Sequence, residues 1–239
     1  MQSAVQGLIE TVHAEEEEAQ KAAAPKPENM RIDGGAVEPG LRGADEQVFS
    51  DVLGETITAM ESGKVPYALI GGIAASGFGR PRWTHDIDLF VKPEDAGRAL
   101  DALEPRGFRT ERTDPRWLYK AYKEDVMVDI IFRSTGGFYL DQEMIDRAVT
   151  YKFKGHDVRL VPAEDLVIMK AVVHDEAGPR HWHDALSIIA GGHLDWHYFS
   201  RRALKAPRRV LSLLIYAQSV DTFVPNEVIR QLHSQLYGM

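Results

Sequence analysis

The sequence predicts an α+β fold in which a mixed sheet flanked by helices is followed by a helical C-terminal part. Short apolar runs bounded by Gly, Pro or charged residues occur between positions 65 and 161 and are typical of strands. Apolar residues at helical spacing separate several of these runs, and after Pro162 they account for the remaining segments. Apolar residues make up 44% of the 239 positions and charged residues 27%, which suffices for a hydrophobic core.

Composition excludes several kinds of protein. The chain has no cysteine, which excludes disulfide bonds, cysteine-based zinc sites and thiol catalysis. No apolar run approaches the roughly 18 residues of a membrane-spanning helix, and no signal peptide is apparent, so we expect a cytoplasmic protein without membrane contact. The net charge is −8, but residues 1–47 carry ten acidic and four basic side chains. The nearly neutral remainder gives no electrostatic argument for or against nucleic acid as a partner.

Three parts are predicted along the chain: an arm over 1–43, an α/β core over 44–162 and a helical region over 163–239. The arm contains four consecutive glutamates, Glu15 to Glu18, and is rich in Gly and Pro. It has few large apolar residues, so burial would not offset the entropy lost on ordering, and we expect a flexible acidic segment. A docking role for this arm is an open alternative.

Each element of the core follows from a local pattern. The helix before Gly63 shows apolar residues at helical spacing, and glycine suits a helix C-terminus. Compact apolar runs predict the strands, and Lys123, Glu124 and Asp125 mark the turn of a hairpin. In order, the expected elements are a helix over 48–60, a strand over 65–70, a short helix over 73–78, a strand over 87–91, a helix over 93–103, hairpin strands over 118–122 and 126–132, and a strand over 158–161. Helices follow over 163–175, 182–190, 195–205, 207–217 and 226–236, several opening on Asp, Pro or Asn, which suit a cap or first turn.

Paired carboxylates are the most informative feature of the core. Side chains alternate across a strand, so Asp86 and Asp88 share one face while Ile87 and Leu89 share the other. Two carboxylates so close raise each other's pKa unless a cation lies between them, and oxygen ligands favour Mg²⁺ or Mn²⁺. Asp129 lies in an otherwise apolar run, where an unpaired carboxylate is costly. Three such aspartates suit two metal ions roughly 3.5–4 Å apart, an arrangement typical of phosphoryl chemistry.

Two glycines follow the first strand of the core. Gly71 and Gly72 allow the backbone to approach an anion closely, and the N-terminus of the following helix would supply N–H groups to phosphates. The familiar glycine motifs do not fit. Gly72 and Gly77 are not followed by Lys-Ser/Thr, so the segment is no P-loop, and it matches neither a dinucleotide fingerprint nor a nucleophile elbow.

Together these features resemble the minimal nucleotidyltransferase superfamily, which has the fold of the DNA polymerase β catalytic domain. The resemblance rests on a strand, Gly-Gly, a spacer of 13 residues, Asp86-Ile-Asp88-Leu and a later strand aspartate. The sequence pattern around Arg82-x-Thr84 is similar to that of the branch that includes AbiEii-type toxins and small stand-alone nucleotidyltransferases. Glu164-Asp165-Leu166-x3-Lys170 and Asp184 extend the similarity to roughly residues 65–190.

The resemblance implies a Mg²⁺- or Mn²⁺-dependent transfer of a nucleoside monophosphate from an NTP to an acceptor hydroxyl, with release of pyrophosphate. Asp86 and Asp88 would hold both metal ions, and Asp129 would complete one metal site and act near the acceptor. The implied nucleotide-binding residues are Gly71, Gly72, Arg82, Thr84 and Lys170, with Asp184 as a further functional position. One departure is that the commonest version has Gly-Ser, whose hydroxyl touches phosphate, whereas Gly72 offers only its backbone. The acceptor would be an RNA such as a tRNA end, a small molecule or a protein.

Rival interpretations remain open at the level of sequence. His193 and His197 have the i, i+4 spacing of a zinc site, although no HExxH motif is present. A basic cluster over 201–209 suits an RNA backbone or a solvated helix face. A catalytically silent nucleotide- or metal-binding module of the same fold, and a regulatory interaction protein that docks through its arm, are the alternatives to an enzyme.

Overall fold

The computed structural model describes residues 43–79, 81, 84–175 and 179–238 of the chain. The chain divides into two units, 1–30 and 31–239, and all described residues belong to the second. Apart from Gly43, the predicted acidic arm therefore lies outside the described residues. The division into an arm, a core and a helical region stays a prediction.

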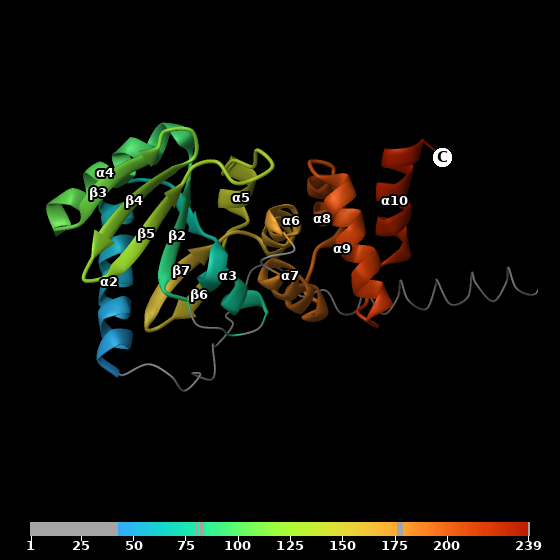
Figure 1. Ribbon diagram of the computed structural model, residues 1–239, viewed down its shortest axis with the longest axis horizontal. Coiled ribbons are helices and arrows are strands. Elements are labelled where there is room, and N and C mark those ends of the chain that lie inside the picture. The colour runs from blue at the N-terminus through green and yellow to red at the C-terminus, as the bar shows by residue number, and fades with distance from the viewer. Residues whose placement is uncertain (1–42, 80, 82–83, 176–178, 239) are drawn as a thin grey trace, which may run out of the picture. The chain divides into compact units, whose positions relative to one another are not determined.

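The described strands form one seven-stranded mixed sheet with the order β3-β4-β5-β2-β1-β7-β6. β2 pairs in parallel with β5, and β1 in parallel with β7, whereas the other neighbours are antiparallel. This confirms the predicted α+β class with a mixed sheet (Figure 1). The strands are β1 (Tyr67–Leu69), β2 (Asp86–Val91), β3 (Arg109–Asp114), β4 (Leu118–Lys123), β5 (Val126–Ile131), β6 (Val149–Phe153) and β7 (His156–Leu160).

Helices cover both faces of this sheet. α2 (Gly43–Ser62) and α4 (Ala96–Leu103) pack against each other and on one face, while α3 (Gly71–Phe78) lies on the other face (Figure 1). Short 3₁₀ turns, Pro93–Asp95 and Glu104–Arg106, flank α4. The remaining helices are α5 (Gln142–Asp146), α6 (Ala163–Val173), α7 (Arg180–Ala190), α8 (Trp196–Ala203), α9 (Pro207–Ser219) and α10 (Asn226–Tyr237).

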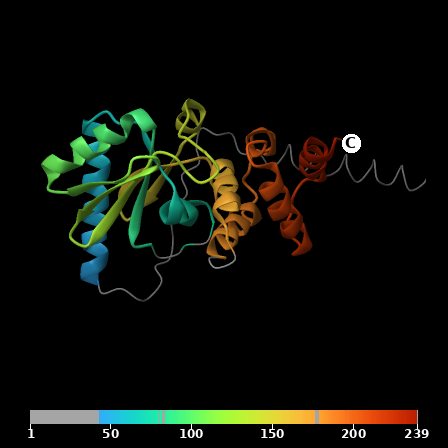
Figure 2. The same cartoon turned by 45° about the horizontal axis from the view of Figure 1, so that its top comes forward.

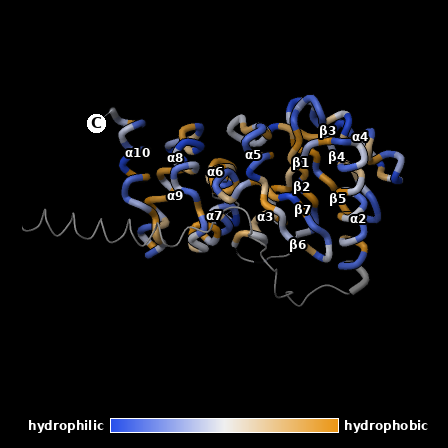
Figure 3. Tube along the Cα trace, turned by 180° about the vertical axis from the view of Figure 1, so that it is seen from behind, coloured by the Kyte–Doolittle hydropathy of each residue, from blue (hydrophilic) through white to orange (hydrophobic). Residues whose placement is uncertain are grey.

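The inner strands carry the core. Ile87 and Leu89 of β2 are fully buried, whereas Asp86 and Asp88 between them are only partly buried, as the period-2 alternation predicts. β1 is buried along its whole length, and Figure 3 shows the inner strands as mainly hydrophobic. The sheet can therefore present a polar group on one face without opening the core behind it.

Three elements were not expected from the sequence. β3 reads Arg-Thr-Glu-Arg-Thr-Asp and lies at a sheet edge with mostly exposed side chains, so it lacks the apolar signal of a strand. β6 is the opposite edge, and it pairs with β7 through a tight turn at Lys154 and Gly155, both with positive φ. α5 spans only five residues and depends on its cap, because Asp141 accepts a hydrogen bond from the Met144 backbone N–H.

The C-terminal helices pack in sequence beyond the sheet (Figure 2). α6 contacts α7, α8 and α9, and α10 packs on α8 and α9. A buried ionic network ties α8 to α6 and α5: fully buried Asp165 accepts hydrogen bonds from Tyr198 Oη and from Arg202 Nε, the latter at 2.7 Å. Arg202 Nη1 also donates to Asp141 at 2.7 Å. Among the described helices, none has the length and apolar character needed to cross a bilayer.

Candidate active site

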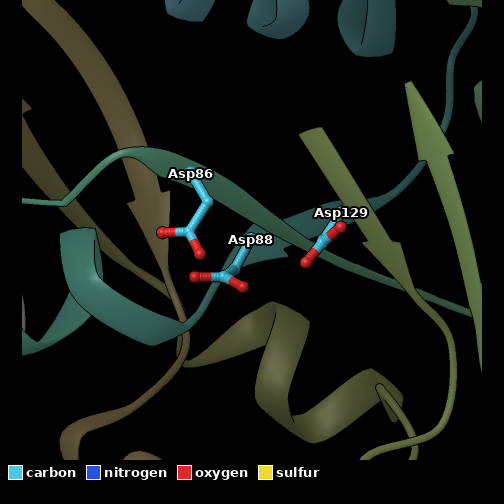
Figure 4. A group of neighbouring side chains, drawn as sticks. All are labelled: Asp86, Asp88 and Asp129. Atoms are coloured by element: carbon cyan, nitrogen blue, oxygen red, sulfur yellow. The ribbon is translucent and has the colours of Figure 1, made fainter. Parts of the chain in front are cut away.

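Three aspartates meet on the α3 side of the sheet. β2 and β5 run in parallel with Asp88 aligned to Asp129, and the alternation along β2 puts Asp86 on the same face. One carboxylate oxygen of each residue lies within 4.8 Å of one oxygen of each of the others. Figure 4 shows all three side chains projecting from the same face. The structure therefore brings together the three residues predicted to hold metal.

Asp88 has the most perturbed environment of the three. Burial, together with the smaller effects of the neighbouring Asp86 and Asp129 carboxylates, raises the pKa of its carboxyl to about 7. The Gly72 backbone N–H, which donates to the Asp88 carboxylate, and the charge of Lys170 oppose this shift. A carboxyl whose proton is retained near neutral pH because of burial and like charges is one that a bound cation would stabilise in the ionised form.

Gly71 is required where it is. Its φ is +64°, a conformation that favours glycine, and a Cβ built on it would lie 1.8 Å from Asp88 Oδ2. A Cβ on Gly72 would lie 2.4 Å from Thr84 Oγ1. The two glycines thus make room for side chains of the site, and the Gly72 N–H donates to Asp88. Binding of phosphate at Gly71 and Gly72 stays a prediction.

Thr84 supports Asp86. Its buried hydroxyl donates a hydrogen bond of 2.7 Å to Asp86 Oδ1 and packs against Gly72. The sequence predicted Thr84 as a nucleotide-binding residue, and the geometry brings it to the site in contact with a carboxylate. Arg82, predicted to neutralise phosphate, lies outside the described residues.

Lys170 and Asp184 form a buried pair. Lys170 Nζ donates to Asp184 Oδ2 at 2.7 Å, and both side chains are at most 8% exposed. The pair joins α6 to α7, and the positive charge of Lys170 lowers the pKa of Asp88. Lys170 does not lie on a solvated helix face, because α6 is buried on all sides from Ala163 to Ala171. A contact of Lys170 with phosphate stays a prediction.

Lys120 is a site residue that the sequence reasoning missed. It lies on β4 opposite Asp129, and its Nζ donates to Asp129 Oδ1 at 2.7 Å. The signal was present in the predicted hairpin. Counting outward from the turn at Glu124 and Asp125 aligns Lys123 with Val126 and therefore Lys120 with Asp129.

The donor set fits a hard divalent cation. Three carboxylates on neighbouring strands, with the pKa of Asp88 raised by burial and by the other two aspartates, offer the oxygen ligands that Mg²⁺ and Mn²⁺ prefer. Within the described part of the chain, no other group of three or more His, Asp or Glu side chains comes as close together. The rival zinc site is not supported, because α8 begins at Trp196 and His193 precedes it, so His193 and His197 do not share a helix face.

Comparisons with known proteins bear on this site. A family model described as "Nucleotidyl transferase of unknown function (DUF2204)" matches residues 50–190, which contain the whole aspartate cluster. No curated protein sequence matches the chain.

Solved structures with similar folds include two of ANT(2'')-Ia. The solution structure of this antibiotic-resistance factor is 17% identical over 72% of this chain and 92% of its own, with a TM-score of 0.46. The crystal structure with adenylyl-2''-tobramycin is 16% identical over 72% of this chain and 97% of its own, with a TM-score of 0.47. The lincosamide antibiotic adenylyltransferase LnuA, lincomycin-bound, is 15% identical over 62% of this chain and 98% of its own, with a TM-score of 0.41.

Proposed function

The chain belongs to this DUF2204 family of nucleotidyl transferases, and from that premise we propose that it transfers a nucleoside monophosphate from an NTP to an acceptor hydroxyl. The acceptor hydroxyl loses its proton to solvent and its oxygen forms a bond to the α-phosphorus, the bond between that phosphorus and the β-bridging oxygen breaks, and pyrophosphate leaves. The observation that carries the proposal is the cluster of Asp86, Asp88 and Asp129 on adjacent parallel strands.

Asp86, Asp88 and Asp129 would hold Mg²⁺ or Mn²⁺. When bound, such ions supply positive charge to the triphosphate and to the attacking and leaving oxygens. The chain's own contribution is to fix the carboxylates: Thr84 holds Asp86, and the Gly72 N–H holds Asp88. In-line displacement depends mainly on such positioning and on electrostatics, so no covalent intermediate on the protein is needed.

Among the described residues, Lys170 is the cationic side chain that we expect to help bind the triphosphate, since its charge lowers the pKa of Asp88 in the aspartate cluster. Asp184 would orient its ammonium group through their buried pair. We also expect Arg82 to contact phosphate, on the strength of its place in the motif. The predicted cytoplasmic location belongs with these proposals.

The acceptor hydroxyl belongs to an RNA, a small molecule or a protein, and one labelling experiment separates these classes. The full chain is incubated with each α-³²P-labelled NTP and Mg²⁺, with total cellular RNA, a small-molecule extract or a protein extract in turn. Asp86→Ala serves as the inactive control. Label that appears in one pool with the wild type and is lost with the variant would support the proposal and identify both donor and acceptor class.

Two outcomes would count against the proposal. Equal labelling by Asp86→Ala would remove the aspartates from the chemistry. NTP binding without label in any pool and without pyrophosphate release would favour the silent nucleotide-binding module instead.

A further inference from the structure

Each carboxylate of the cluster receives a hydrogen bond from the protein. Thr84 donates to Asp86 and the Gly72 N–H donates to Asp88, and Lys120 Nζ donates to Asp129. Of these three donors, Lys120 is the charged one. A carboxylate has two oxygens, so a donor on one of them leaves the other available while fixing the direction in which it points.

The Lys120–Asp129 contact is well defined. The two residues are register partners on antiparallel strands β4 and β5, the donor–acceptor distance is 2.7 Å, and the side chains are 18% and 15% exposed. Met127 Sδ lies 3.0 Å from the same ammonium group. On the other side of Lys120, its register partner Glu111 accepts a hydrogen bond from Thr113 at 3.1 Å. The lysine is therefore directed at the aspartate cluster.

We propose that Lys120 is a positioning residue that aims Asp129 for nucleotidyl transfer and, through its fixed positive charge, weakens cation binding to the nucleotide-free protein. The inference rests on the proposed function of the aspartate cluster. Three carboxylates carry three negative charges when ionised, and Lys120 reduces the net charge of the group to two. The free site is thus matched to the charge of one divalent ion rather than two.

This double role predicts effects of opposite sign. Lys120→Met keeps an unbranched side chain that is one atom shorter, but removes both the charge and the donor. Loss of a positive charge several ångströms from the cation should tighten Mn²⁺ binding by about tenfold. Loss of the donor that orients a ligand should slow transfer by about 10- to 100-fold in kcat. The KM for NTP should change by less than about twofold, because Lys120 holds a carboxylate and not the triphosphate.

The test uses the full chain and measures Mn²⁺ affinity by titration with electron paramagnetic resonance of the free ion, without nucleotide. Lys120→Arg should restore both wild-type Mn²⁺ affinity and transfer to within about threefold, since it keeps a charged donor. Lys152→Met is the matched control, because Lys152 on the edge strand β6 forms an exposed cross-strand pair of 3.1 Å with its register partner Asp157 on β7. That control should leave affinity and kcat unchanged. If Lys120→Met does not fold, as judged by its melting curve, Lys120→Gln takes its place.

Weaker or unchanged Mn²⁺ binding by Lys120→Met would overturn the proposal, as would an unchanged kcat or a raised KM for NTP. Asp88→Asn separates this failure from failure of the proposed function. If Asp88→Asn loses Mn²⁺ binding while Lys120→Met behaves as wild type, only the role of Lys120 is wrong. If Asp88→Asn binds Mn²⁺ as wild type does, the metal site itself is wrong. Should no acceptor pool be labelled by the wild type, the Mn²⁺ titration alone decides.

Discussion

Replacing Asp88 by asparagine should stabilise the metal-free protein at alkaline pH. The pKa of the Asp88 carboxyl is raised from 3.8 to about 7 in the folded protein, chiefly by burial. A raised pKa means that the folded state holds the proton more tightly than the unfolded state, so this group favours folding at low pH. That contribution is lost as the pH rises from about 4 through about 7.

The size of the effect follows from the same values. One pKa unit corresponds to about 1.4 kcal/mol, so ionising Asp88 costs the metal-free fold about 2–4 kcal/mol above pH 7, the lower figure allowing for its partial exposure. Asparagine carries no charge, and its side-chain oxygen still accepts from the Gly72 N–H. Asp88→Asn should therefore match the wild type near pH 4 and exceed it by about 2–4 kcal/mol at pH 8.

Urea unfolding of both proteins in EDTA between pH 4 and pH 8 measures this difference. Addition of Mg²⁺ at pH 8 should stabilise the wild type and have little effect on the variant, because the cation replaces the missing counter-charge only where the carboxylate is present. A parallel decline in the unfolding free energies of wild type and variant with pH, or a variant less stable than the wild type at pH 8, would show that ionisation of Asp88 does not destabilise the fold.

Three further predictions concern other parts of the structure. Gly71→Ala should weaken Mn²⁺ binding by about tenfold or more, because the new Cβ would occupy the position of the Asp88 carboxylate. Gly107→Ala is the control: its φ is also positive but its surroundings are open, so Mn²⁺ binding in the same titration should be unchanged. Lys170→Met should lower the free energy of unfolding by about 3 kcal/mol, because it leaves the buried Asp184 without its lysine. In urea unfolding, the double variant with Asp184→Asn should recover part of that loss, and no recovery would mean that the two residues are not coupled. Arg202→Met should lower the free energy of unfolding by about 3 kcal/mol, because it leaves the fully buried Asp165 without its arginine. Arg201→Met replaces a mostly exposed arginine and should lower it by less than about 1 kcal/mol. Similar melting temperatures for the two variants would contradict this.

The sequence was informative wherever burial leaves a periodic trace. The alternation in β2 and the lone aspartate in β5 identified the carboxylate cluster, because period 2 fixes the face of each side chain once the strand is recognised. The helices after Pro162 were likewise visible from their apolar spacing and their first residues. Asp195, for example, caps α8 through the Tyr198 N–H.

Features that depend on pairing between strands were harder to predict. β3 has no apolar pattern and forms a strand by pairing with β4, so its own composition does not predict it. Lys120 belongs to the site only through its register with Asp129. The steric need for Gly71 arises from the Asp88 side chain packed against it, whereas the sequence suggested phosphate as the reason.

The order of strands in the sheet has a consequence for how this protein is made. β1 lies between β2, the next strand in the sequence, and β7, whose Leu160 pairs with Leu69 from far along the chain. A nascent polypeptide that has emerged only to residue 140 already carries all three aspartates, yet one edge of its buried inner strand β1 lacks a neighbour. Contacts of such large sequence separation slow folding, and an apolar unpaired edge invites association with other chains. We therefore expect the sheet that carries the aspartate cluster to be completed only after synthesis of the β6–β7 hairpin, which contributes no residue to the cluster.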